Sequence, residues 1–156
     1  MDLNLKIFIN KVGPSTMIGR PAIFSREAFN IVKNDPFFTF GAEDADLSRQ
    51  MEIAGMPQGH GTGTVYRKNL ETMGECYRQW RRYGEGDGRF VCKHPSRILS
   101  VLFHLAIYYP IIKSVRVARL GFWRYSGFFV MQGLVRLIWA SKEYVSLKVR
   151  GAPDTN

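Results

Sequence analysis

The first forty residues predict short extended segments and one short helix. Residues 1–12 alternate apolar and polar side chains as a strand does, and residues 13–24 predict a turn followed by a second extended segment. Ser25 can cap a helix over residues 26–34. The inward face of that helix would consist of Ala28, Phe29 and Val32. Residues 37–40 (FFTF) then predict an aromatic, strand-like patch.

Two longer helices follow, and a glycine-rich loop separates them. Apolar residues at helical spacing, Leu47, Met51 and Ala54, predict a helix that begins at the acidic residues 43–46 and stops at Gly55. The loop GMPQGHGTGT leads to a second helix, predicted over residues 69–83. The apolar stripe of that helix would be formed by Leu70, Met73, Tyr77 and Trp80, of which we interpret Tyr77 and Trp80 as core residues.

The chain becomes strongly apolar after residue 97. Two apolar stretches, residues 98–112 and 120–140, flank the basic segment KSVRVAR. Neither is a clean membrane span, because His104 and Pro110 interrupt the first and charged or amide residues interrupt the second. In the second stretch Phe128, Met131, Val135 and Ile138 share one helical face, while Gln132 and Arg136 share another. This pattern favours a helix in the membrane interface; the alternative is a buried core helix of a soluble fold.

The totals restrict the class of protein. With 156 residues, the chain suits one domain plus a tail. The net charge of +9 suits a partner rich in phosphate, such as nucleic acid, a nucleotide or anionic lipid. The two cysteines, Cys76 and Cys92, indicate neither a disulfide framework nor a zinc site, and no export signal is recognised.

These patterns together predict an α+β fold. We expect a partial domain of short strands and two or three helices over residues 1–95, then apolar, membrane-associated helices over residues 96–145, then a flexible tail over residues 146–156.

Three carboxylates open the helix that begins near residue 43. Glu43, Asp44 and Asp46 could simply accept hydrogen bonds from the first-turn N–H groups and oppose the helix dipole. They could equally serve chemistry, because a second polar group of side chains follows about thirty residues later. There, on the helix predicted over residues 69–83, Gln79, Arg82 and Tyr83 would project together at i, i+3 and i+4. An amide, a guanidinium and an aromatic ring can hold a sugar hydroxyl, a diphosphate and a sugar face; the alternative is a solvated basic helix face.

Taken in order, these residues resemble the second half of an inverting family 2 glycosyltransferase with the GT-A fold. The resemblance runs from about Gly13 to Phe90. IGRPAIFSREAF is similar to the acceptor side of that family's cleft, and FFTFGAEDADLSRQMEIAG resembles its E-D-x-D-L-x-x-R/Q helix start. QWRRYGEG resembles its Q-x-x-R-W motif, with Tyr83 in place of tryptophan.

The resemblance implies transfer of a sugar, with inversion, from a nucleotide-diphosphate or lipid-phosphate donor to a hydroxyl of a glycan or lipid acceptor. Asp44 would be the general base, and Glu43 or Asp46 would hold the acceptor or set the charge around Asp44. On the second helix, a leaving diphosphate would be neutralised by Arg82 with Arg78 or Arg81, and the acceptor channel would be lined by Gln79 and Tyr83.

The family also implies Mg²⁺ or Mn²⁺, whose main ligands are not found in this chain. No nucleotide-binding half with its metal-binding aspartates is recognised ahead of Gly13, so the chain resembles a C-terminal part that would need a missing N-terminal half. Arg67 stands where many members have a metal-binding histidine. His60 in the glycine-rich loop is a weak substitute candidate for a metal ligand.

The apolar tail fits members that work at the cytoplasmic face of the cell membrane in polysaccharide or glycolipid synthesis. Lys113, Arg116 and Arg119 would then meet anionic headgroups. One rival is a non-catalytic basic module that binds nucleic acid, but interleaved acidic residues over residues 71–87 argue against it, so no nucleic-acid partner is expected. The other is a membrane-surface scaffold in which the carboxylates only cap a helix.

Overall fold

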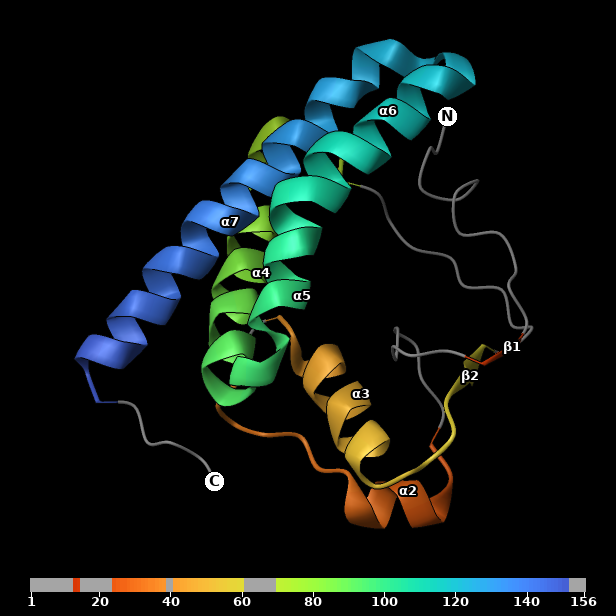
Figure 1. Ribbon diagram of the computed structural model, residues 1–156, viewed down its shortest axis with the longest axis vertical. Coiled ribbons are helices and arrows are strands. Elements are labelled where there is room, and N and C mark those ends of the chain that lie inside the picture. Colours follow the sequence, from red (N-terminus) through yellow and green to blue (C-terminus); the bar gives the residue numbers. More distant parts are fainter. Residues whose placement is uncertain (1–12, 15–23, 39–40, 61–69, 152–156) are drawn as a thin grey trace. The chain divides into compact units, whose positions relative to one another are not determined.

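The computed structural model describes residues 13–14, 24–38, 41–60 and 70–151, and helices dominate these residues (Figure 1). The only strand pairing among them joins β1 (Gly13–Pro14) to β2 (Gly59–His60), antiparallel, with Gly13 opposite His60. The predicted α+β class is therefore wrong. A pairing of two residues a side is too short to form a sheet with a buried face, so helices provide the packing.

The chain forms two compact units, each described by itself. The first contains the β1–β2 pair and two helices, α2 (Arg26–Ile31) and α3 (Glu43–Ile53). The second contains the described part of Phe37–Ala42 and the chain from Thr72 onward. The strand predicted over residues 1–12 lies outside the described residues. Phe37 and Phe38 lie in a turn and an irregular segment, so the predicted strand-like patch is not found at these two positions.

Local signals set the helix ends in the first unit. The Ser25 side chain accepts a hydrogen bond from the N–H of Ala28, 3.1 Å away, and so caps α2 as predicted. Gly55 has a φ of 65°, its N–H donates to the carbonyl of Glu52, and the N–H of Met56 donates to that of Met51. This pair of bonds is a Schellman motif, so the predicted stop at Gly55 is confirmed.

The core of the first unit joins α2 to α3. Ala28, Val32 and Met51 are buried, with Phe24, Leu47 and Met56 packed against them. Phe29, predicted to face inward, is 71% exposed, so that prediction is wrong.

The second unit is a bundle of three helical runs (Figure 1). The first and third runs are parallel to each other, and the second is antiparallel to both. Its first run is α4 (Met73–Lys93), and a short η1 (Pro95–Arg97) leads into the second. The second run consists of α5 (Ile98–Phe103), η2 (His104–Lys113), α6 (Ser114–Val117) and η3 (Ala118–Phe122). After η4 (Trp123–Tyr125) the third run, α7 (Ser126–Val149), returns.

The second and third runs form a helical hairpin, Ile98–Val149. Gly121 turns the chain between them with a φ of 87°, a conformation that glycine adopts without strain. The side chains of Ser114 and Ser126 exchange hydrogen bonds with each other's carbonyls at 2.9 and 3.1 Å, next to the turn. Of the described chain, the stretch Pro95–Val149 is apolar and long enough to cross a membrane by length and composition alone.

Small residues let α4 and α7 approach closely. A Cβ added at Gly84 would lie 2.6 Å from the carbonyl oxygen of Arg136, and one at Gly88 would lie 2.5 Å from that of Ala140. Because these glycines serve helix packing, α4 continues to Lys93, and the predicted end at Tyr83 is wrong. The predicted apolar stripe is also wrong except at Trp80, which is 2% exposed: Leu70, Met73 and Tyr77 are exposed, and the buried positions of α4 are Cys76, Trp80, Gly84, Gly86, Gly88 and Val91.

Candidate functional site

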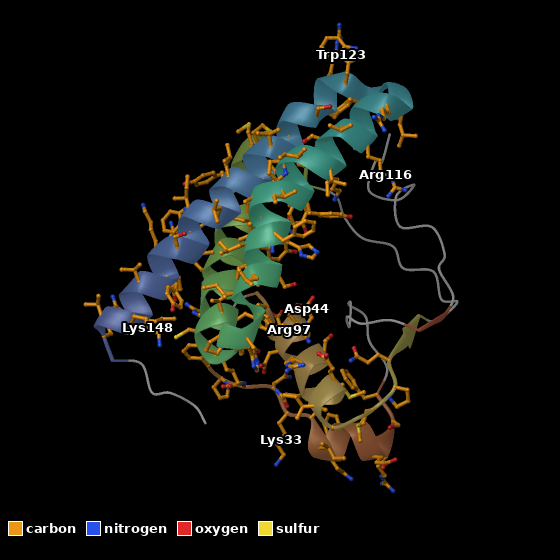
Figure 2. The ribbon with its side chains drawn as sticks, viewed as in Figure 1. Lys33, Asp44, Arg97, Arg116, Trp123 and Lys148 are labelled. Atoms are coloured by element: carbon orange, nitrogen blue, oxygen red, sulfur yellow. The ribbon has the colours of Figure 1, made fainter. Side chains whose placement is uncertain are left out.

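The acidic cluster occupies the first turn of α3, where Figure 2 labels Asp44. The Asp44 Oδ1 atom accepts a hydrogen bond from the N–H of Ala45 at 2.9 Å. This carboxylate therefore has at least the capping contact that its position predicts. Ala42 precedes the helix with a φ of 63°, in the left-handed region that costs a residue with a Cβ about 1–2 kcal/mol. The entry to the helix is thus held in an uncommon backbone conformation.

Asp46 is only 1% exposed and belongs to a hydrogen-bonded chain within the first unit. Gln50 Nε2 donates to Asp46 Oδ2 at 2.8 Å and to the carbonyl of Lys33 at 3.1 Å, and its Oε1 accepts from the N–H of Lys33. The Asp46 carboxylate therefore helps to fix the segment after α2 against α3.

The polar group predicted on the second helix lies on α4. Gln79 Nε2 donates to the hydroxyl of Tyr83 at 2.9 Å, so these two side chains share a face. Both are half-buried, while Arg82 and Arg78 are exposed. An amide and a phenol that already orient each other, beside exposed guanidinium groups, can bind hydroxyl and phosphate groups.

Arg81 has structural partners on the bundle. Its Nε atom lies 2.8 Å from Glu85 Oε1, and its guanidinium lies 4.2 Å from the centre of the Trp139 ring. The hydrogen bond and charge of Glu85 raise the pKa of Arg81, so the group stays protonated. These contacts tie the outer face of α4 to α7.

Next to the Tyr83 ring lies an ion pair that the sequence analysis did not predict. Arg136 on α7 binds Asp87 on α4 through two nitrogens, Nε at 2.9 Å and Nη2 at 2.8 Å, with both side chains about 15% exposed or less. The Arg136 guanidinium also lies 5.5 Å from the Tyr83 ring and 5.1 Å from the Tyr109 ring. The signal in the sequence was Arg136 itself, the only charged residue between Ser126 and Ser141.

The residues before the acidic cluster contact α4 next to Arg82. A Cβ at Gly41, which has a φ of 85°, would lie 2.9 Å from the carbonyl oxygen of Arg82. A Cβ at Gly86 would lie 2.6 Å from the carbonyl of Gly41. Only glycine fits both positions, so Gly41 and Ala42 lie directly against the α4 backbone.

Asp44 belongs to the first unit, and Gln79, Arg82 and Tyr83 belong to the second. A joint site of these residues therefore stays a prediction. Arg67 lies outside the described residues, as does the side chain of His60.

The described residues do not form a metal centre. No group of three or more His, Cys, Asp or Glu side chains among them could hold a metal ion. Asp46, which has D-x-D spacing with Asp44, is bonded to Gln50 in the interior instead. The Mg²⁺ or Mn²⁺ that the resemblance implies has no fitting ligand set in this part of the chain.

Lys113 differs from the other two basic residues predicted to meet headgroups. It is half-buried, with its Nζ atom 4.6 Å from the centre of the Phe129 ring and 5.3 Å from that of Tyr109, whereas Arg116 and Arg119 are exposed.

Comparison with known families adds one finding. Residues 4–147 match the sequence profile of a family described as "Glycosyl transferase family group 2". The match spans both units and includes the apolar hairpin as far as residue 147. No curated protein and no solved structure matches the chain.

Proposed function

The chain belongs to the family described as Glycosyl transferase family group 2, and from this premise we propose the reaction and its residues. The reaction is transfer of a sugar from a nucleotide-diphosphate or lipid-phosphate donor to a hydroxyl of a glycan or lipid, with inversion at the anomeric carbon. It contributes to cell-envelope polysaccharide or glycolipid synthesis.

Asp44 is the general base in this proposal. Its carboxylate takes the proton of the acceptor hydroxyl as that oxygen attacks the anomeric carbon, while the bond to the phosphate oxygen breaks. The hydrogen bond from the Ala45 N–H to Oδ1 supports this role because it fixes the orientation of the carboxylate. Glu43 adds negative charge beside Asp44 and helps to hold the acceptor.

The α4 residues bind the two substrates. Arg82, with Arg78, neutralises the charge that develops on the leaving diphosphate. The observation that carries this assignment is the hydrogen bond between Gln79 and Tyr83, because it presents an ordered amide–phenol pair on the helix that also carries the exposed arginines. That pair lines the acceptor channel.

Asp46 and Arg81 support the site more indirectly. Asp46 steadies the first turns of α3 through Gln50, and Arg81 steadies α4 through Glu85 and Trp139. Both therefore set the substrate-binding positions through their neighbours.

The apolar hairpin associates with the cytoplasmic face of the cell membrane. This location suits lipid-linked donors and growing glycans, and the long apolar stretch Pro95–Val149 supports it.

Asp44→Asn tests the function. Asparagine retains an oxygen that can accept from the Ala45 N–H, so folding should persist while proton abstraction fails. We expect the rate of sugar incorporation to fall about 100-fold or more. The assay supplies labelled nucleotide-diphosphate sugars to membranes from cells that produce the chain, and circular dichroism of the purified chain reports folding.

The matched control is Glu52→Gln, which neutralises an exposed carboxylate later on the same helix, paired with Arg49. It should leave incorporation unchanged. Full activity in Asp44→Asn would contradict the general-base role, and equal losses in both variants would show only a general effect of removing a charge from α3.

A further inference from the structure

The hairpin carries an exposed apolar surface along both of its helical runs. Leu99 is 78% exposed, Ile111 54% and Val145 58%. Exposed apolar side chains also include Leu102, Phe103 and Ile107 on the first run and Met131, Leu134 and Ile138 on the second. Residues 98–112 contain no Asp, Glu, Lys or Arg, and the one such residue between Ser126 and Ser141, Arg136, is held by Asp87. Water is a poor solvent for such a surface.

The positive charge of the chain is concentrated in the same region. Residues 93–151 contain ten Lys and Arg and one acidic residue, Glu143, while the rest of the chain has equal numbers of basic and acidic residues. Glu143 forms an ion pair with Arg89 at 2.8 Å. The whole net charge of +9 therefore accompanies the apolar surface. An apolar face combined with an excess of basic residues matches an anionic lipid leaflet.

We propose that the hairpin Ile98–Val149 lies within one leaflet of an anionic phospholipid bilayer and does not cross it. The inference rests on the membrane association given under the proposed function, and it is independent of the transfer chemistry.

The packing of α4 excludes a crossing orientation. Contacts between α4 and α7 include those of Trp80 with Phe128, whose ring centres are 4.7 Å apart, and, further along both helices, those of Gly88 with Ala140 and Tyr144. The two helices thus run parallel along the length of α4. If α7 crossed the bilayer, α4 would enter the hydrocarbon with it. Its exposed arginines at 78, 81 and 82 could not be solvated there.

The two ends of the hairpin suit a position at the headgroups. Figure 2 labels Arg116 and Trp123 at the turn end and Lys148 at the other. Trp123 is 67% exposed and Tyr125 53%, and both residue types favour the headgroup level of a bilayer. A shallow groove of about 440 Å³ near the turn is lined by Ile111, Ile112, Val115, Arg116, Arg119 and Leu120. All of these side chains belong to one helical run, residues 111–120, so this face presents apolar and basic groups side by side to a lipid surface.

Labelling the two ends of the hairpin from each side of the membrane tests whether the hairpin crosses the bilayer. Trp123→Cys marks the turn, and Val149→Cys marks the end of α7. The full chain is produced in bacterial cells, and a membrane-impermeant maleimide is added to spheroplasts and to inverted membrane vesicles, with the unmodified chain giving the background from Cys76 and Cys92. If the hairpin lies in the cytoplasmic leaflet, the maleimide reacts with both variants in inverted vesicles and with neither in spheroplasts. A crossing hairpin would place its turn outside, so labelling of the Trp123→Cys variant in spheroplasts overturns the proposal, as does recovery of the chain in the soluble fraction.

Vesicle binding tests the lipid charge. The purified chain should bind phosphatidylcholine vesicles containing phosphatidylglycerol much more tightly than vesicles of phosphatidylcholine alone. Replacing Arg116 and Arg119 by Gln together should weaken that binding about 25-fold, because each basic residue near the surface contributes about fivefold. The control replaces two exposed basic residues of the first unit, Arg26 and Lys33, by Gln and removes the same charge. Equal losses of binding in the two double variants, or equal binding to both vesicle types, would overturn the proposed preference for an anionic leaflet.

Neither the labelling assay nor the vesicle assay depends on sugar transfer, so both remain informative if the proposed function fails.

Discussion

Gly88 decides how closely α4 approaches α7. A methyl group there would meet the Ala140 carbonyl oxygen at 2.5 Å and the Glu143 Cβ at 2.9 Å, and a backbone atom cannot move aside as a flexible side chain can. We therefore expect Gly88→Ala to lower the free energy of unfolding by about 1–3 kcal/mol through overpacking. Urea denaturation followed by circular dichroism measures this change.

Gly74→Ala is the matched control in the same helix. Its nearest neighbour, Arg78 Nη1, lies 3.8 Å from the added Cβ, so alanine meets no obstacle. The higher helix propensity of alanine should leave stability unchanged or raise it by up to about 1 kcal/mol. If both variants had the same stability, the close approach at Gly88 would be refuted.

Cys76 and Cys92 should differ in reactivity. Cys76 is 6% exposed on the buried side of α4, and burial, followed by the charge of Glu75, raises the pKa of its thiol. A raised pKa leaves less thiolate at pH 8, and only the thiolate is nucleophilic. Iodoacetamide should therefore modify Cys76 more slowly than the half-buried Cys92, and mass spectrometry can count each adduct. Unfolding in urea should remove the difference; a difference that persisted there would have another cause.

The start of α2 and the end of α3 were predictable because their signals are local, whereas α2 ends at Ile31 and not at the predicted residue 34. Ser25 bonds an N–H three residues later, and Gly55 adopts a left-handed conformation that favours glycine, so neighbouring residues alone determine both ends. The end of α4 was mispredicted for the opposite reason. The glycines after Tyr83 disfavour a helix in isolation, and they are tolerated because α7 and the Gly41 backbone pack against them.

In the candidate site, too, local features were predictable from the sequence and long-range contacts were not. The shared face of Gln79 and Tyr83 follows from their spacing within one helix, and their hydrogen bond agrees with it. The Asp87–Arg136 pair was not predictable, because its partners are 49 residues apart and meet only after the bundle has formed. The α+β prediction failed on a related point: among the described residues, strand pairing joins only Gly13–Pro14 to Gly59–His60, which is too short to form a sheet with a buried face.

The start of α4 provides a prediction for a whole helix. Thr72 Oγ1 accepts from the N–H of Glu75, and Glu75 Oε2 accepts from the N–H of Thr72, which together form a capping box. Thr72→Ala should lower the free energy of unfolding by about 1 kcal/mol. Thr72→Ser, which keeps the hydroxyl, should lose much less. Equal losses in thermal unfolding would mean that the hydroxyl bond does not stabilise α4.

The bundle as a unit depends on charged groups enclosed between α4 and α7. Asp87 and Arg136 form a two-pronged pair, Arg89 and Glu143 form another pair further along, and the close contact at Gly88 lies between them. Glycine packing sets the distance between the helices without fixing their register, since the same close approach could occur one turn away. The ion pairs select one register because only that register satisfies the enclosed charges.

A double-mutant cycle on Asp87 and Arg136 tests that role. Asp87→Leu leaves the mostly buried Arg136 without its counter-charge, and Arg136→Met leaves Asp87 in the same state; each should cost about 3 kcal/mol in the free energy of unfolding. Joining Arg136→Met to Asp87→Leu removes both charges, and the double variant should recover most of that loss. Additive losses in the cycle would mean that the two side chains do not interact.

The proposed function places Tyr83 in the acceptor channel, and the Arg136 guanidinium lies over the Tyr83 ring. On that proposal the double variant should bind acceptor more weakly even though its stability recovers. A raised KM for the acceptor at unchanged thermal stability would separate this effect on the α4 site from a loss of folding.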